Sequence, residues 1–338
     1  MTGVLLVRHG ETDWNRNRRC QGTSDIQLNE RGRWQAGMVA EALRGENLAA
    51  VYSSPLARAR ELAAAVAAFH GLEVHLSRDL EEMDHGGLEG LTFQQITACY
   101  PEVLRVWRTE PDRVRLPGGE SLGDAQERGA RFLTGIAAAP PSASILVVSH
   151  AFLLSTIMCS TLGLPLSCAR RVQPDLASIS RIGFRQGGGF FLDTFNNRHH
   201  LDPLEFRGSL VDGIGEGKRL TQIPWVRRQF MDKIGIDPYP GTINLAVESP
   251  GDLAMVRLMR SLPGITITPE EMGFCSAAAY PVLVAGKWRG AVIVPDVPSY
   301  PLSSVEIIAA ERLRERLTSP GDGLITVRVL PPGDQGTP

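Results

Sequence analysis

Cysteine is scarce in this sequence: its five cysteines are scattered, and none belongs to a Cys-x-x-Cys motif. That pattern argues against a zinc-ribbon site and against a disulfide framework. The chain also has no apolar run long enough to cross a bilayer and no leader-like start, so we expect a cytoplasmic protein with no membrane partner. A charge excess is missing too, because 35 basic and 37 acidic residues leave a net charge of −2, and we therefore expect no nucleic-acid partner.

The chain is nevertheless long enough, at 338 residues, for two globular domains. Strand-like apolar runs alternate with helical segments up to about residue 200, which predicts a three-layer α/β/α domain over residues 1–202. The predicted elements are Val4–Val7, Glu30–Leu43, Ala50–Ser53, Leu56–Phe69 with its first turn at Pro55, Glu120–Ala138, Ser144–Ser149, Phe152–Leu162, and a hairpin of Ser178–Phe184 and Gly189–Thr194 around Gly187-Gly188.

The character of the sequence changes near residue 203. Short β-rich segments separated by glycine and proline follow, and they predict a small β-barrel over residues 203–332. Two helical segments, Trp225–Ile234 and Ile307–Leu317, are expected to interrupt these strands. No long linker separates the two predicted domains.

Chemistry-bearing side chains follow the first predicted strand directly, as Arg8-His9-Gly10. Ligands of open α/β sheets bind beyond the carboxyl ends of the strands. An arginine fork suits phosphate oxygens, and a neutral imidazole can attack phosphorus. The strand end therefore predicts a phosphate site with a nucleophilic histidine.

The stretch LLVRHGETDWN, Leu5–Asn15, resembles the histidine phosphatase (phosphoglycerate mutase-like) superfamily. Over about residues 2–200 more of that family's pattern follows in order, in YSSPLARA (52–59), LEEMDHGGLEG (80–90), PGGESL (117–122) and ILVVSH (145–150). The resemblance implies that His9 becomes phosphohistidine without a metal cofactor. It also implies a phosphate pocket made by Arg8, Arg58 and His150, with Asn15 lining it.

A leaving alkoxide needs a proton, so a carboxylic acid is expected near the histidines. Glu82 matches the family's acid, but Glu81 stands where the family usually has a basic residue, so either carboxylate remains a candidate. The connector between the acid segment and PGGESL is modest, as in the small broad-range and α-ribazole phosphatases. It favours hydrolysis of a small-molecule phosphomonoester over mutase activity.

In the second half, Gly213–Lys218 reads GIGEGK, and its alternating glycines let a backbone approach a ligand closely. The spacing is not that of a Walker loop. Further on, Gly235–Leu245 reads GIDPYPGTINL. Thr242 and Asn244 in that string share one side of a strand, and their oxygens suit Mg²⁺.

Over about residues 207–330, GEGK, RQF, GIDPYPGTINL, VEIIA and LRE resemble the archaeal-type CTP-dependent riboflavin kinases in content and order. The resemblance implies CTP as phosphate donor, riboflavin or a related ribityl compound as acceptor, FMN as product, and Mg²⁺ held by Thr242 and Asn244. Glu306 would contact the flavin. The implied nucleotide-binding residues are Gly213, Ile214, Gly215, Glu216, Gly217, Lys218, Glu311, Arg312, Leu313 and Arg314.

One position departs from the kinase pattern, because Pro298 stands where the family tends to have a threonine that contacts the flavin. Nucleotide and metal motifs are kept, so CTP and Mg²⁺ are better supported than riboflavin. The leading interpretation is a bifunctional phosphatase and kinase. Two alternatives remain: a phosphatase regulated by a non-catalytic flavin- or nucleotide-sensing barrel, and a phosphomutase with an appended barrel.

Overall fold

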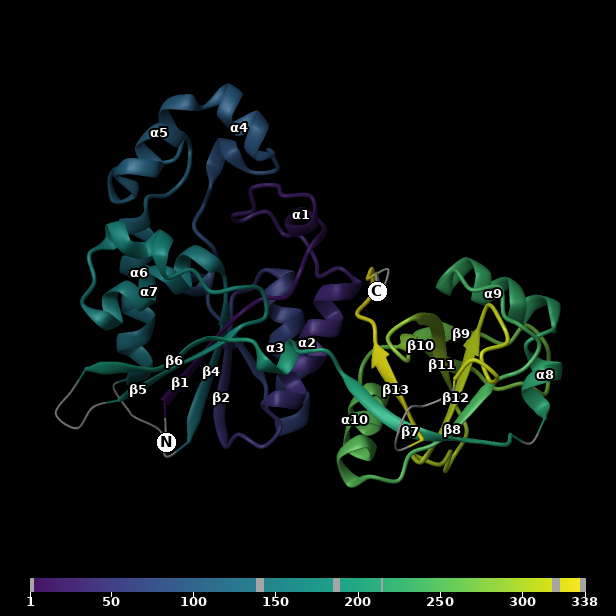
Figure 1. The fold of residues 1–338 in the computed structure, drawn as a ribbon. Helices are drawn as coiled ribbons and strands as arrows, with labels where there is room; N and C mark the ends of the chain where they lie inside the picture. The colour runs from purple at the N-terminus through teal and green to yellow at the C-terminus, as the bar shows by residue number, and fades with distance from the viewer. Residues whose placement is uncertain (1–2, 138–142, 185–188, 214, 318–322, 335–338) are drawn as a thin grey trace. The chain divides into compact units, whose positions relative to one another are not determined.

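The computed structural model describes residues 3–137, 143–184, 189–213, 215–317 and 323–334 (Figure 1). It divides into two compact units, Met1–Leu201 and Asp202–Pro338. Among the described residues, every helix is too short or too polar to span a bilayer. Each unit is described by itself below.

Unit 1 is built on a six-stranded mixed sheet in the order β3-β2-β4-β1-β5-β6. The first four strands of that order are parallel to one another, whereas β5 runs antiparallel to both β1 and β6. The bounds are β1 Gly3–Arg8, β2 Leu48–Ser53, β3 Val74–Leu76, β4 Ser144–Ser149, β5 Ile179–Phe184 and β6 Phe190–Asn197.

The apolar run of β1 forms a central strand because both of its faces are covered. Val4 and Leu6 belong to one core cluster, and Leu5 and Val7 belong to another on the opposite face. Helices α6 (Leu122–Ala137) and α7 (Ala151–Leu162) pack on the first face, and α2 (Glu30–Ala42) and α3 (Ala57–His70) pack on the second. The predicted three-layer α/β/α fold is therefore confirmed.

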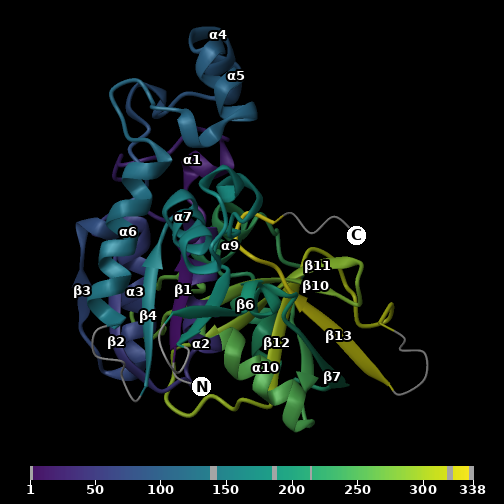
Figure 2. The ribbon, with the colours of Figure 1, turned by 90° about the vertical axis from the view of Figure 1, so that its left-hand side faces the viewer.

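Three short helices that the sequence pattern did not predict lie above the carboxyl ends of the strands: α1 (Asp13–Arg16), α4 (Phe93–Cys99) and α5 (Pro101–Thr109). Figures 1 and 2 both show α4 and α5 at the end of unit 1 opposite the beginning of β1. Single turns of 3₁₀ helix lie at Arg78–Leu80, Gly86–Leu88, Pro111–Arg113 and His199–Leu201, and a longer 3₁₀ helix spans Leu166–Arg171.

Unit 2 is a closed antiparallel barrel. Its strands follow the order β11-β12-β8-β7-β13-β10, and pairing of β10 with β11 closes the ring, while β9 extends it beside β10. This confirms the predicted small β-barrel. The bounds are β7 Glu205–Val211, β8 Ile243–Ala246, β9 Ile265–Ile267, β10 Ala277–Val284, β11 Trp288–Pro295, β12 Ser304–Ala309 and β13 Leu324–Val329, with helices α8 Glu216–Leu220, α9 Pro224–Ile234 and α10 Pro250–Ser261.

Two local predictions are wrong. The helix predicted over Ile307–Leu317 is absent: Ile307 and Ile308 are buried in strand β12, which pairs with β8 and β11, and residues 310–317 form bends and turns. Helix α3 begins at Ala57 after an N-cap at Leu56, so Pro55 lies outside its first turn. The predicted turn at Gly187-Gly188 lies outside the described residues.

Candidate active sites

His9 follows β1 and is buried, with 3% of its surface exposed. Its Nδ1 lies 2.7 Å from the Gly10 carbonyl oxygen. A carbonyl only accepts, so Nδ1 carries the proton and Nε2 carries the lone pair. Burial lowers the pKa of His9 well below its ordinary value, and the nearby Arg58 and Arg8 lower it further. His9 is therefore a neutral imidazole with a nucleophilic nitrogen.

The next residue fixes how His9 is presented. A Cβ atom at Gly10 would lie 2.6 Å from the Gly32 carbonyl oxygen at the start of α2, so only glycine permits this close approach. The loop after β1 is thus pressed against α2, and His9 is held at the strand end.

Arg58 and His150 form the wall beside His9. Arg58, in α3, is fully buried, and its Nε–H donates to Nδ1 of His150 at 3.2 Å. Burial lowers the pKa of Arg58 to about 10, which still leaves a cation at neutral pH. His150 accepts at Nδ1, so its proton lies on Nε2, and burial together with Arg58 lowers its pKa well below the ordinary value. The His9 and His150 ring centroids are 5.1 Å apart.

Two N–H groups here are buried without a hydrogen-bond partner in the described chain, Nε of Arg8 and Nε2 of His150. Another nitrogen of Arg8 donates to the Pro174 carbonyl at 2.9 Å, which holds the guanidinium in place. Unpartnered buried donors are costly, so their presence next to His9 indicates a site built for an anion.

Asn15 lies nearby on α1, but its oxygen is used locally. Thr12 donates to Asn15 Oδ1 from its backbone N–H at 3.0 Å, which completes a capping box. This contact orients the Asn15 amide. That Asn15 also contributes to phosphate binding stays a prediction.

Glu82 is the carboxylate that enters this site. It is 4% exposed, and its Oε1 accepts from the backbone N–H groups of Met83 at 2.9 Å, Phe152 at 3.1 Å and Leu153 at 3.1 Å. The last two groups belong to the first turn of α7, where N–H groups point out of the helix. Glu82 also interacts electrostatically with Arg8 and Arg58.

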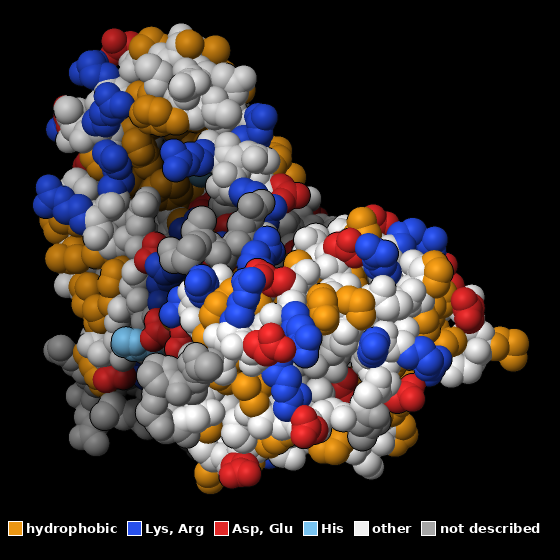
Figure 3. Space-filling model, turned by 45° about the vertical axis from the view of Figure 1, so that its right-hand side comes forward, with side chains coloured by type: hydrophobic (Ala, Val, Ile, Leu, Met, Phe, Trp, Pro, Cys, Tyr) orange, Lys and Arg blue, Asp and Glu red, His pale blue; other side chains and the backbone are white. Residues whose placement is uncertain are grey.

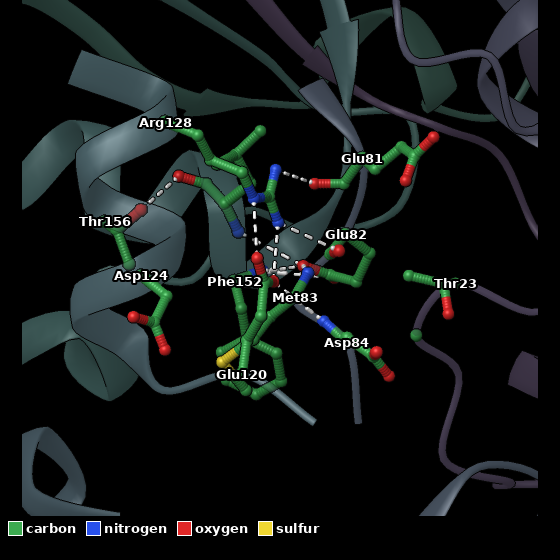
Figure 4. A network of polar contacts seen from close by, with 12 residues as sticks. Thr23, Glu81, Glu82, Met83, Asp84, Glu120, Asp124, Arg128, Phe152 and Thr156 are labelled. Carbon is green, nitrogen blue, oxygen red and sulfur yellow. Dashed lines mark hydrogen bonds and ion pairs between the residues drawn. The ribbon is translucent and has the colours of Figure 1, made fainter. Parts of the chain in front are cut away.

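An arginine clamp holds the backbone around Glu82 (Figure 4). Arg128, in α6, donates to the carbonyl oxygens of Glu81 at 2.6 Å and Glu82 at 3.0 Å, and it also forms an ion pair with Glu120 at 3.0 Å. Glu120 accepts in turn from the Asp84 N–H at 3.0 Å. The Glu81 side chain points away from this network in Figure 4, so the geometry favours Glu82 over Glu81 as the acid.

Sequence reasoning missed the groups that position Arg58. Two Arg58 nitrogens donate to the Gly22 and Ser24 carbonyls at 2.6 and 2.8 Å. Glu89 holds that loop by accepting from the N–H groups of Thr23 at 2.7 Å and Ser24 at 2.8 Å. Burial raises the pKa of Glu89, but hydrogen bonds from Ser24 and Thr23 outweigh it, and the pKa is lowered. Glu89 stands inside the recognised string LEEMDHGGLEG, so the sequence marks its position but not its partners.

His85 was also missed. It is buried, its Nδ1 lies 3.2 Å from Cys20 Sγ, and its ring packs on Phe152. Burial lowers its pKa, so the ring is neutral. In the sequence, only the position of His85 three residues after Glu82 indicates that it could lie near the site.

In unit 2, the glycine-rich segment lies directly on Thr242 and Asn244. A Cβ at Gly217 would be 2.6 Å from Thr242 Oγ1, and one at Gly213 would collide with the Asn244 amide. The Asn244 nitrogen is 3.4 Å from Thr242 Oγ1. The structure therefore brings together two motifs that are about 25 residues apart in the sequence.

Glu306 joins this group from β12. It pairs with Asn244 across the β8–β12 ladder, so both side chains emerge on one face of the barrel wall. Tyr300 donates its hydroxyl to Glu306 Oε1 at 2.9 Å, and burial together with Glu306 raises the Tyr300 pKa to about 12. The carboxylate is thus held by a phenol that stays protonated.

Two cavities meet at Thr242. One, of about 150 Å³, has apolar walls and also contains Gly217 and Glu306; its aromatic lining comes from Trp225, Phe230 and Phe274. The other, of about 160 Å³, lies between the PYPGTI string and the segment after β12, and its walls include Tyr239, Pro240, Gly241, Ile243, Glu311, Arg312, Leu313 and Arg314.

The remaining residues predicted to bind the nucleotide differ in their burial and in their contacts. Arg314 donates to Asp212 at 2.6 Å, which ties the segment after β12 to the start of the glycine-rich segment. Leu313 is buried, so only its surface toward the cavity is available. Gly215, Glu216 and Lys218 are exposed around the start of α8, and Ile214 lies outside the described residues. Pro298 is exposed, and the wall of the apolar cavity is formed instead by Pro295.

Solved structures and curated proteins resemble part of this chain. Bacillus stearothermophilus YhfR aligns with a TM-score of 0.57 and 29% identity, over 60% of this chain and 100% of its own. The mycobacterial glucosyl-3-phosphoglycerate phosphatase Rv2419c aligns with a TM-score of 0.55 and 29% identity, over 58% and 99%. A phosphoserine phosphatase 1 from Hydrogenobacter thermophilus is 38% identical over 49% of this chain and 79% of its own length.

A probable phosphoglycerate mutase GpmB from Cronobacter sakazakii is 35% identical over 60% of this chain and 96% of its own length. Phosphatases and mutases thus both occur among these relatives. The family model of the histidine phosphatase superfamily (branch 1) matches residues 4–198. A second model, for CTP-dependent riboflavin kinases and described as domain of unknown function DUF120, matches residues 210–329. The chain therefore belongs to the histidine phosphatase superfamily, and it carries a CTP-dependent riboflavin kinase family domain after the phosphatase domain.

Proposed function

We propose that unit 1 hydrolyses a phosphomonoester through a phosphohistidine. His9 Nε2 forms a bond to phosphorus while the ester P–O bond breaks, and Glu82 gives its proton to the leaving oxygen. Water then attacks the phosphohistidine and loses its proton to Glu82, which breaks the P–N bond and releases phosphate. The supporting observation is the pair of unpartnered buried N–H groups beside the neutral His9.

Arg8, Arg58 and His150 would neutralise the three phosphoryl oxygens, with Asn15 at the rim. Because these groups supply the charge, the reaction needs no metal. We expect His9→Ala to abolish phosphate release from a phosphomonoester and a chelator to leave the native rate unchanged. Turnover that survives His9→Ala, or that EDTA removes, would contradict this mechanism.

The mutase alternative predicts a different product. A mutase returns the phosphoryl group to a second hydroxyl, so isomers of a phosphorylated acid interconvert without phosphate release. Phosphorus NMR on a mixture of such isomers separates the two activities, and we expect inorganic phosphate to accumulate.

We also propose that unit 2 transfers the terminal phosphate of CTP to an acceptor hydroxyl. The supporting observation is that two cavities of different chemistry share Thr242. The cavity beside Glu311–Arg314 would take the nucleotide, with Gly213–Lys218 over its phosphates. The apolar cavity beside Glu306 would take the acceptor, and its aromatic lining suits the flat ring of riboflavin or a related ribityl compound.

A magnesium ion fits this junction. Thr242 Oγ1 and Asn244 Oδ1 are neutral oxygen donors two positions apart, and the backbone of Gly213 and Gly217 lies close against them. When bound, Mg²⁺ would offset the charge of the transferring phosphate. Thr242 and Asn244 would hold it, and Glu306 lies across the ladder, where it can orient the acceptor hydroxyl.

The test uses the full chain with CTP, Mg²⁺ and a panel of ribityl compounds, followed by mass spectrometry. Thr242→Ala with Asn244→Ala should abolish transfer while phosphatase activity is kept. If the native chain binds CTP and a flavin but transfers nothing, the barrel is a sensor, and the kinase proposal is wrong. A clear preference for ATP over CTP would also count against it.

A further inference from the structure

Unit 1 contains a cavity that the phosphate site does not account for. It has a volume of about 220 Å³ and lies under α4 and α5. Met83 and Phe152, whose N–H groups hold the Glu82 carboxylate, both contribute to its walls. The cavity therefore begins one residue from the proposed acid, where the leaving group of a bound ester must lie.

The walls of this cavity are aromatic. Trp107, on α5, and Phe152 meet edge to face with their ring centroids 5.3 Å apart. The His85 ring also meets Phe152 edge to face, at 5.4 Å between centroids, and is kept neutral by burial. An edge-to-face cluster of this kind accepts another flat ring readily, because ring edges and faces are complementary in charge.

Two guanidinium groups lie at the rim, Arg108 from α5 and Arg170 from the turn after α7. Arg108 is over the Phe93 ring at 5.7 Å, and Arg170 is over the Trp107 ring at 5.9 Å. Neither is in an ion pair with a carboxylate in the described part of the chain, and no described acidic side chain lines the cavity. Figure 3 shows this hollow with apolar walls and basic side chains at its rim.

We propose that the phosphatase substrate carries a planar aromatic group with an anionic or carbonyl-rich edge on its alcohol portion. The ring would enter the cavity against Trp107 and Phe152, and its electron-rich edge would face Arg108 and Arg170. This inference deepens the phosphatase function proposed above and rests on it. Small polar substrates, such as phosphoserine, would leave the cavity empty.

Three alkyl phosphates with similar leaving groups test this substrate class: ethyl phosphate, 2-phenylethyl phosphate and 2-(4-carboxyphenyl)ethyl phosphate. We expect kcat/KM to rise by about tenfold from the ethyl to the phenylethyl ester, equivalent to about 1.4 kcal/mol. The carboxylated ester should gain about fivefold more through the arginines, and this second gain should shrink with added salt.

Variants assign the gains to residues. Trp107→Leu should reduce the advantage of the ring, and Arg108→Gln should remove most of the advantage of the carboxylate. The control is Arg105→Gln, since Arg105 is on the same helix but pairs with Glu102 at the surface. Arg105→Gln should keep the native kcat/KM on all three esters, and the effect of each cavity variant is measured as the ratio of its kcat/KM on an aromatic ester to its own kcat/KM on ethyl phosphate.

Equal kcat/KM for the three esters, or a preference for phosphoserine over them, would overturn the inference while the phosphatase function stands. Absence of phosphate release from every ester would instead overturn the phosphatase function. In that case, calorimetry with the same esters and the His9→Ala protein still measures how tightly each ester binds. Binding of ethyl phosphate as tight as that of the aromatic esters would again contradict the inference.

Discussion

Replacing Glu82 by glutamine tests the proposed acid with little disturbance of the fold. Glutamine keeps an oxygen that can accept from Met83, Phe152 and Leu153, as Oε1 of the carboxylate does. Only the longer bond from Phe152 to Oε2, at 3.2 Å, loses its acceptor. The substitution therefore removes the transferable proton and leaves the buried N–H groups satisfied.

The expected loss depends on the leaving group. General acid catalysis contributes about 10²–10⁴ in rate, so hydrolysis of an alkyl phosphate should slow by at least about 10²-fold, or about 2.7 kcal/mol. The leaving group of an activated aryl phosphate departs as a stable phenolate, so hydrolysis of that ester should slow by less than about tenfold. Initial rates on both esters, measured under single-turnover conditions, give the ratio directly.

The matched control is Glu81→Gln, because the Glu81 side chain points away from the network (Figure 4). It should change neither rate by more than about twofold, as for a surface substitution. The reasoning is refuted if Glu82→Gln slows both esters equally, since Glu82 would then act only through its charge. It is also refuted if Glu81→Gln carries the loss on the alkyl ester.

The remaining predictions concern pH and the two activities together. Burial lowers the pKa of His9, His85 and His150, so the unfolded chain binds more protons below about pH 6.5, and stability falls there by up to about 1.4 kcal/mol per histidine and pH unit. Thermal denaturation between pH 7.5 and 5.5 should show this fall, His150→Asn should reduce it, and an unchanged midpoint would contradict it. We also expect FMN to be a poorer phosphatase substrate than a phosphorylated ribitylamino-pyrimidine, since removal of phosphate from FMN would only consume CTP. Comparing kcat/KM in Thr242→Ala, Asn244→Ala protein tests this, and a tenfold preference for FMN, about 1.4 kcal/mol, favours a flavin switch instead.

The sheet of unit 1 and the barrel were predictable because their strands are buried on both faces or alternate regularly. The run Val4–Val7 has no polar interruption, so it reads as a central strand, and β4 was predicted with its observed bounds. The helix predicted over Ile307–Leu317 is wrong because a charge pattern alone does not establish a helix. Charged residues after Ala309 have a helical spacing, but residues 310–317 form bends and turns, and the two isoleucines before them pair in a ladder.

The candidate phosphate site could be predicted because its residues follow strand ends or stand inside recognised strings. Arg128, Trp107 and Arg170 could not, because each acts through a contact with a distant segment. Arg128 holds a backbone carbonyl about 46 residues away, and nothing in the local sequence of α6 marks that partner. Contacts of this kind depend on tertiary packing, which a local pattern does not encode.

The main chain and the side chain of Phe152 contact different parts of the proposed site. The N–H group helps to hold the Glu82 carboxylate, whereas the ring lines the cavity under α5. A different side chain at this position can keep the same N–H donor, so the preference for one alcohol over another can change without loss of the acid. Many of the other walls come from α4 and α5, which pack against the edge of the core under α6 and α7 and are not part of the sheet. Changes of substrate within this architecture are therefore expected to accumulate in residues 93–109 and at position 152, while the groups that handle phosphorus stay fixed.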